Sequence, residues 1–135
     1  MTAMETTPMK LFLLPDDYAI CRLAPGESED APWWRAPDAL SLRLETPAET
    51  SILCPAGLVP EGVKAEGPWR AFELEGPLPF ELVGVLHGVL GALAAEGISI
   101  LAYSSFDTDY VLVATSRVAD ARAALEAAGY ELRTG

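Results

Sequence analysis

The chain has 135 residues, half of them hydrophobic, and its 20 acidic and 9 basic side chains give a formal net charge of −11. This length allows one domain, or two very small ones that share a core, and the composition is that of a globular protein and not of a disordered one. The acidic balance argues strongly against nucleic acid or an anionic membrane as a partner, because both require a basic surface.

Residues 1–8 show no periodic pattern and no signal-peptide core, so they are predicted to be a disordered tail. Without an export signal we expect a cytoplasmic protein whose two cysteines are reduced. Cys21 and Cys54 each lie in an apolar run, which favours small buried side chains over nucleophiles.

The first half of the chain is rich in strand-like runs and poor in helix. A turn at Pro15-Asp16-Asp17 is predicted to separate the first two runs, and Gly67-Pro68 marks the predicted seam with the second half. Residues 58–64 form at most a short helical turn. We expect this half to complete the sheet of the second half, and its strands are predicted at residues 10–14, 18–23, 39–44 and 50–54.

The second half has a complete pattern of alternating element types. Its order is strand, helix, strand, strand, helix, strand, which is the ferredoxin-like βαββαβ arrangement with an antiparallel sheet, an α+β fold. For the second helix, Ser116 is the predicted N-cap and Gly129 the left-handed residue after its end. The six elements are predicted at residues 69–75, 80–96, 98–104, 110–115, 117–128 and 130–133.

The first of these helices carries three glycines on one face, Gly84, Gly88 and Gly91. Each costs about 1 kcal/mol against alanine in a helix, so something is expected to pack close to the backbone there. That neighbour is either another part of the same chain or a helix of a second copy. His87 lies on the same face and is interpreted as a core or interface imidazole and not as a catalytic base. The helix is too short and too polar to span a membrane.

Catalytic and cofactor motifs are not found. One histidine and two separated cysteines do not match the ligand spacing of a zinc site, and no phosphate-binding glycine loop is present. Cys21 or Cys54 with His87 would form a nucleophile pair only if the fold brought them together. The strand-to-helix junction at residues 73–81 is either an anion-binding helix N-terminus or an ordinary turn with Pro79 at the first helical position.

Two stretches resemble a known family. Residues 96–100, Glu-Gly-Ile-Ser-Ile, and residues 103–113, Tyr-Ser-Ser-Phe-Asp-Thr-Asp-Tyr-Val-Leu-Val, are similar to the small-molecule-sensing ACT domain. More closely, they resemble the family of the cytosolic CASTOR arginine sensors and of small bacterial proteins related to the regulatory ACT domains of aspartate kinases. Residues 39–54 look like the first repeat of that family. The resemblance implies a tandem of two ACT-like repeats, a degenerate, strand-rich one at 9–66 and an ACT domain at 67–135.

The resemblance also implies a function, a non-catalytic regulatory protein that binds a free amino acid where paired ACT domains meet, which here requires a homodimer. Loop N–H groups would bind the ligand carboxylate, Glu75 or a loop carbonyl its ammonium group, and Asp109 would favour a basic side chain such as that of arginine. Two alternatives stay open, a ligand-free module for dimerisation or partner docking and an undiscovered enzyme. The implied ligand-binding residues are Glu75, Gly76, Pro77, Leu78, Pro79 and Leu82 of the loop, with Ser104, Ser105, Phe106, Thr108 and Asp109 of the hairpin.

Overall fold

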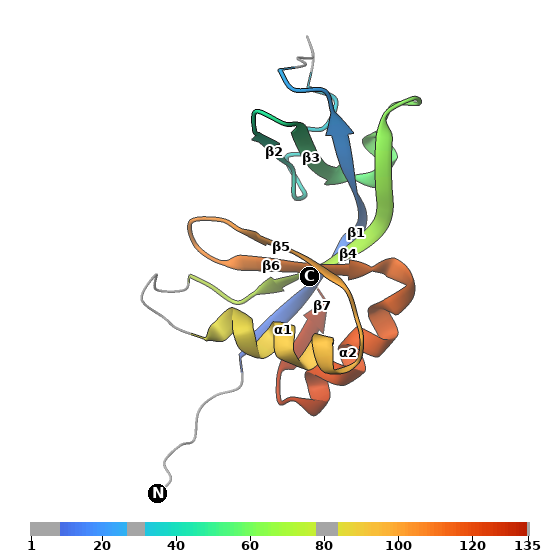
Figure 1. Cartoon of the computed structure of the whole chain (residues 1–135). Coiled ribbons are helices and arrows are strands. Elements are labelled where there is room, and N and C mark those ends of the chain that lie inside the picture. Colours follow the sequence, from blue (N-terminus) through green and yellow to red (C-terminus); the bar gives the residue numbers. More distant parts are fainter. Residues whose placement is uncertain (1–8, 27–31, 78–83, 135) are drawn as a thin grey trace, which may run out of the picture. The chain divides into compact units, whose positions relative to one another are not determined.

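The computed structural model describes residues 9–26, 32–77 and 84–134 (Figure 1). Two α-helices and two short 3-10 helices alternate with strands along these ranges. The elements in chain order are β1 (Lys10–Leu23), β2 (Leu42–Glu45), β3 (Thr50–Pro55), η1 (Ala56–Leu58), β4 (Lys64–Leu74), α1 (Val85–Ala95), β5 (Ile100–Ser104), β6 (Asp109–Ala114), η2 (Thr115–Arg117), α2 (Val118–Ala127) and β7 (Glu131–Thr134).

The chain divides into two compact units. Unit 1 combines Met1–Pro15 with Arg70–Gly135, and unit 2 is Asp16–Trp69. Two long strands, β1 and β4, belong partly to each unit. The predicted seam at Gly67-Pro68 lies inside β4, shortly before that strand leaves unit 2.

The sheet of unit 1 contains the predicted ferredoxin-like elements together with the first part of β1. β5 and β6 form an antiparallel hairpin, with Ile100 opposite Val113 and Ser104 opposite Asp109. β6 neighbours β4, β4 neighbours β1, and β1 pairs in parallel with β7 from Lys10–Glu131 to Leu13–Thr134. The expectation that the first half of the chain completes the sheet of the second is confirmed, because β1 lies between β4 and β7.

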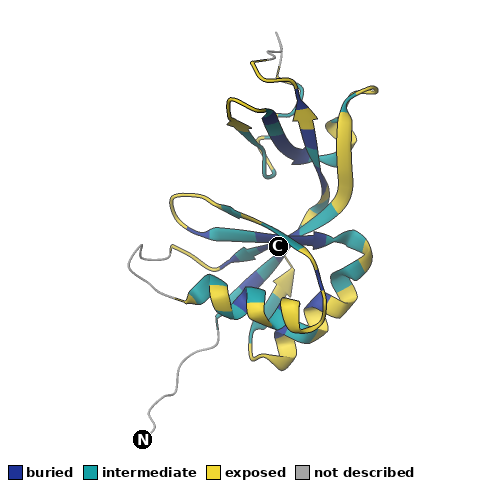
Figure 2. Cartoon of the chain, viewed as in Figure 1, coloured by how far each residue is buried: buried dark blue, intermediate teal, exposed yellow. Residues whose placement is uncertain are grey.

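Both helices of unit 1 contribute to one hydrophobic core. Val89 and Leu93 of α1 pack with Ala121 and Leu125 of α2 against buried side chains of the sheet, among them Phe72. The strand residues of this cluster alternate along their strands, as they must when one face of a sheet is covered by helices. In Figure 2 the buried, dark blue segments of unit 1 lie mainly on its strands. The remaining fully or nearly buried members are Leu11, Leu13, Leu74, Ile98, Val111 and Val113.

The helix ends differ from their predictions. α1 begins at Val85 and not near residue 80, because Gly84 has φ of +87°, which a right-handed helix does not include. Residues 80–83 lie outside the described ranges. α2 begins at Val118 after a 3-10 turn that contains Ser116, so the predicted Ser116 N-cap is wrong. Gly129 has φ of +100°, and its predicted left-handed role is confirmed.

The predicted turn at Pro15-Asp16-Asp17 is also wrong, since β1 runs unbroken from Lys10 to Leu23. One edge of β1 pairs with β7 over residues 10–13 and with β3 over residues 18–23. Pro15 falls between these two ladders, where its missing N–H breaks neither of them. The sequence signal of a turn therefore marks a change of strand partner.

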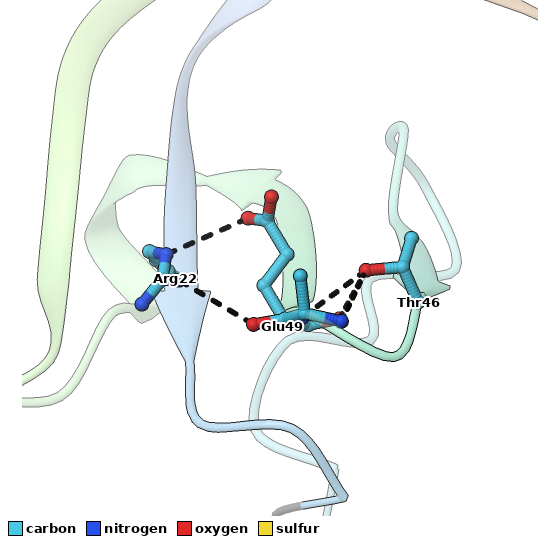
Figure 3. A network of polar contacts seen from close by, with 4 residues as sticks. Arg22, Thr46 and Glu49 are labelled. Carbon is cyan, nitrogen blue, oxygen red and sulfur yellow. Dashed lines mark hydrogen bonds and ion pairs between the residues drawn. The ribbon is translucent and has the colours of Figure 1, made fainter.

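Unit 2 is built from strands. β3 pairs antiparallel with both β1 and β2, and in the described part of unit 2 the helical structure is limited to the 3-10 turn η1. In the turn between β2 and β3, the Thr46 hydroxyl accepts hydrogen bonds from the N–H groups of Ala48 and Glu49, both 3.1 Å away (Figure 3). Arg22 of β1 lies 3.7 Å from the Glu49 carboxylate, so charge as well as strand pairing joins β1 to this turn.

The core of unit 2 is smaller than that of unit 1. It consists of Ala19, Cys21 and Leu23 from β1 and Ile52 and Cys54 from β3. Half-buried side chains surround these five, including the indoles of Trp33 and Trp34. The tryptophans thus enter the core, but they cover it only partly.

Candidate functional site

The strand-to-helix loop of unit 1 begins where β4 ends at Leu74. The N–H of Glu75 donates a hydrogen bond to the carbonyl oxygen of Lys10 at 3.0 Å, which holds the start of the loop against β1. Glu75, Gly76 and Pro77 are exposed. Because Pro77 has no N–H and that of Glu75 is used, Gly76 is the candidate amide donor in this part of the loop.

The tip of the β5–β6 hairpin is closed by side chains, as its composition predicts. The N–H of Ser105 donates to the carbonyl oxygen of Thr108 at 2.8 Å, and the N–H of Thr108 donates to the Ser105 hydroxyl at 3.2 Å. At the base of the tip the Ser104 hydroxyl donates to Oδ1 of Asp109. This contact orients the Asp109 carboxylate while the remaining oxygen stays available as an acceptor.

The loop and the hairpin tip meet. Thr108, only 7% exposed, donates from Oγ1 to the carbonyl oxygen of Leu74 at 2.7 Å. A Cβ at Gly76 would lie 3.0 Å from both the Asp107 carbonyl oxygen and the Thr108 Cβ. Only glycine allows this approach without displacement of the tip. The two segments that the sequence proposed as halves of one site are therefore in direct contact.

Acidic groups surround this junction. The Tyr110 hydroxyl donates to Oε2 of Glu73 at 3.2 Å, which fixes one carboxylate beside the hairpin. Glu75 and Asp107 are exposed, and Phe106 at the tip is 79% exposed. The junction therefore presents an aromatic ring and several hydrogen-bond acceptors, a combination suited to an ammonium or guanidinium group.

The structure describes eight of the eleven predicted ligand residues. Ser104, Ser105, Phe106, Thr108 and Asp109 share the hairpin end, next to Glu75, Gly76 and Pro77. Leu78, Pro79 and Leu82 lie outside the described residues. Sequence reasoning missed Glu73 and Tyr110 as a contacting pair, because their proximity depends on the pairing of β4 with β6, which periodicity does not reveal.

Two of the three glycines of α1 have an explanation within the chain, and the two explanations differ. A Cβ at Gly88 would lie 2.5 Å from the Tyr130 hydroxyl oxygen, so a tight contact within the chain accounts for this glycine. Gly84 needs its positive φ, and a Cβ at Gly91 would meet nothing within 4 Å. His87 is exposed on the chain, so its interpretation as a core imidazole is wrong.

Both cysteines belong to unit 2 and His87 belongs to unit 1, so neither unit by itself contains the cysteine–histidine nucleophile pair. Within the described ranges, no three potential metal ligands among His, Cys, Asp and Glu gather in one place. Across the same ranges, helices long and apolar enough to cross a membrane are not found.

Comparison with known proteins agrees with the sequence resemblance at the level of the domain. Residues 64–127 match the family model of the ACT domain, which covers 64 of the 135 residues. The match begins with β4 and ends with α2, so it includes both the loop and the hairpin of the candidate site. No curated protein matches the chain significantly.

Several solved structures share the fold. A protein from Agobacterium tumefaciens has 28% sequence identity and a TM-score of 0.87, with 96% of each chain covered. A protein of unknown function from Vibrio cholerae, described as a possible transport protein, has 20% identity and a TM-score of 0.74, with 90% of each chain covered.

The aspartate kinase of Clostridium acetobutylicum is a more distant likeness, with 11% identity and a TM-score of 0.59. It covers 85% of this chain and 33% of the kinase, so the similarity concerns one part of that enzyme and shows the fold alone. Residues 64–127 are therefore similar to the ACT domain, and the chain shares its fold with these solved structures.

Proposed function

We propose that this chain is a non-catalytic regulatory protein that binds a free amino acid at the junction of the β4–α1 loop with the β5–β6 hairpin. The observation that carries the proposal is the direct contact between these segments, made by Thr108 Oγ1 with the Leu74 carbonyl and by Gly76 with the hairpin tip. The ACT match over the same residues supports it, because ACT domains typically bind amino acids in regulatory roles.

Each part of an amino acid has a proposed partner at this junction. The Gly76 N–H binds the carboxylate, and the exposed Glu75 carboxylate binds the ammonium group. Asp109, oriented by Ser104, binds the end of a basic side chain, and the fit is best for arginine because a guanidinium pairs with a carboxylate through two parallel hydrogen bonds. Thr108 is a positioning residue, since its hydroxyl is used in holding the hairpin to Leu74.

The proposed site is completed by a second copy of the chain, so the functional form is a cytoplasmic homodimer in which two ACT domains face each other. Unit 2 is proposed to be a degenerate ACT-like repeat, so that the chain is a small tandem relative of the arginine sensors. Its strands pair as a sheet, and the part of unit 2 that the structure describes contains no α-helix to complete the repeat.

A thermal-shift screen against the twenty amino acids, combined with light scattering, tests the proposal. A ligand at 100 times its Kd stabilises the native state by about 2.7 kcal/mol, which raises the Tm by several degrees. Asp109→Asn is expected to reduce the rise in Tm that the ligand causes. The control Asp120→Asn removes the same charge from the outer face of α2 and is expected to leave this rise unchanged.

The oligomeric state gives a separate result. A folded dimer that responds to none of the amino acids would contradict the binding proposal and favour a module for dimerisation or partner docking. A monomer that binds an amino acid would contradict only the proposed pairing of sites.

A further inference from the structure

Cys21 and Cys54 are neighbours inside unit 2. The antiparallel pairing of β1 with β3 sets Ala19 opposite Cys54 and Cys21 opposite Ile52, so the two cysteines are diagonal neighbours on adjacent strands. Both belong to the small core of unit 2, and their exposures are 1% and 0%. They are free thiols that point into the same cluster.

The two thiols interact with each other. Each thiol influences the pKa of the other. Burial, and after it the neighbouring Cys21, raises the pKa of Cys54 to about 12, and burial raises the pKa of Cys21 as well. Since the thiolate is the reactive form, the pair is protected as long as unit 2 stays closed.

We propose that Cys21 and Cys54 form a redox-active dithiol, which a low-molecular-weight disulfide such as oxidised glutathione converts into a disulfide between β1 and β3 when unit 2 opens. One cysteine thiolate attacks the oxidant, breaking its S–S bond, releasing one glutathione thiol and leaving a mixed disulfide. The second cysteine then displaces the second glutathione thiol. In balance, the two protein thiols are oxidised to one disulfide and one glutathione disulfide is reduced to two thiols.

The geometry accounts for both formation and reversal. Diagonal neighbours in an antiparallel pair have Cα atoms about 7–8 Å apart, slightly beyond the usual span of a disulfide. The bond therefore requires β1 and β3 to draw together. Disulfides that need such adjustment are the more easily reduced ones, which suits a reversible modification and not a permanent structural link.

The crosslink has a defined consequence for unit 2. It closes a loop that contains β2 and the two neighbouring tryptophans, Trp33 and Trp34. A disulfide restricts the unfolded chain more strongly as the enclosed loop grows, and this loop runs from Cys21 to Cys54. Oxidation is thus expected to stabilise unit 2 and to leave the candidate site of unit 1 chemically unchanged.

The test uses the full reduced chain incubated with oxidised glutathione and analysed by intact mass under non-reducing conditions. The expected product is a monomer lighter by two hydrogen atoms, with no alkylatable thiol after denaturation and a Tm several degrees above that of the reduced chain. Dithiothreitol is expected to restore both thiols. The rate of formation is expected to rise at urea concentrations below the main unfolding transition, since opening exposes the pair.

Cys21→Ser and Cys54→Ser are the controls, because each leaves one thiol and permits only a mixed disulfide. The proposal is overturned if, at urea concentrations that open unit 2, the wild-type chain keeps both thiols, retains glutathione on both cysteines, or links to a second chain. Equal oxidation rates for the native and the fully unfolded chain would overturn the gating by burial.

Discussion

The two units of this chain reach their folded state in different ways. Unit 1 covers one face of its sheet with two helices and has a buried cluster of eleven described residues, whereas unit 2 relies on strands and its buried cluster has five. Unit 2 nevertheless shares β1 and β4 with unit 1, so two of its strands are extensions of a larger sheet. The difference indicates that a small unit with a limited core depends on strand continuity, on local turns such as that of Thr46, and on its tryptophans.

The chain offers separate probes for the two units. Both α-helices belong to unit 1, and all three tryptophans, Trp33, Trp34 and Trp69, belong to unit 2. Far-UV circular dichroism at the helical band therefore follows unit 1, and tryptophan fluorescence follows unit 2.

The largest expected effect comes from the two cores. Phe72→Ala is expected to cost unit 1 about 3–5 kcal/mol, because a fully buried phenylalanine leaves a cavity beneath the helices. Ile52→Ala is the matched change in unit 2, at about 2–5 kcal/mol. Denaturant unfolding is expected to show Phe72→Ala shifting the helical signal more than the fluorescence, and Ile52→Ala the reverse. Identical shifts of both signals in both variants would mean that the units unfold as one.

Alkaline pH is expected to weaken unit 2 before unit 1. Burial keeps the Cys54 thiol protonated in the folded chain up to a pKa of about 12, whereas in the unfolded chain it ionises near its ordinary value of 9.0. The unfolded state thus loses the proton first, and above about pH 9 the free energy of unfolding falls by up to about 1.4 kcal/mol per pH unit. In unit 1, burial raises the pKa of Tyr103 and Tyr130 from 10.0, so the corresponding fall begins about one pH unit later.

Urea midpoints from tryptophan fluorescence at pH 8, 9 and 10 measure this decline. Cys54→Val removes one of the two buried thiols and is expected to reduce the decline to the part that Cys21 contributes. A wild-type midpoint that is constant over the same range would contradict the assigned role of the thiol.

Threonine hydroxyls provide a smaller contrast between a buried and an exposed hydrogen bond. Thr108→Val leaves the buried Leu74 carbonyl oxygen in unit 1 without its donor, at an expected cost of about 1–3 kcal/mol. Thr46→Val removes an exposed acceptor in the turn of unit 2, where water replaces it, so the expected cost is below about 1 kcal/mol. Chemical denaturation of both variants measures the two losses of unfolding free energy. A larger loss for Thr46→Val than for Thr108→Val would contradict the prediction.

The smallest effect separates two glycines of α1. Gly91→Ala is expected to stabilise unit 1 by up to about 1 kcal/mol, because the added methyl group meets no neighbour and alanine favours the helix. Gly88→Ala gains the same propensity but forces the Tyr130 hydroxyl to move, so the expected net change is a loss of about 1 kcal/mol. Adding Tyr130→Phe to Gly88→Ala is expected to recover part of that loss in thermal unfolding. No recovery would show that the Tyr130 hydroxyl is not the obstacle.

The fold of unit 1 could be predicted because its signals are local. The apolar periodicity of residues 85–95 and 118–127, the polar hairpin tip and Gly129 each specify structure through near neighbours. The errors occur where the chemistry of a residue fits more than one role. Pro15 has the chemistry of a turn but lies where β1 changes partner, and Ser116 has the chemistry of a cap but lies inside a 3-10 turn.

The candidate site stays a prediction, and its residues came from the resemblance to ACT domains. The loop and the hairpin each have a recognisable composition, but their contact through Thr108 and Gly76 depends on β4 and β6 lying side by side. Pairing of strands distant in sequence leaves no mark on either segment alone. The Glu73 to Tyr110 hydrogen bond was missed for that reason. Gly84 and Gly88 have two different explanations, and nothing in the structure explains Gly91.

The parallel pairing of β1 with β7 has a consequence for synthesis of the chain. Lys10 is synthesised long before its strand partner Glu131. Until then one edge of the first part of β1 has unpaired backbone groups, and contacts between such distant residues form slowly. Folding of unit 1 is therefore expected to finish only after Glu131 has been synthesised, and nascent chains that stall in β6 would carry a sheet edge open to aggregation.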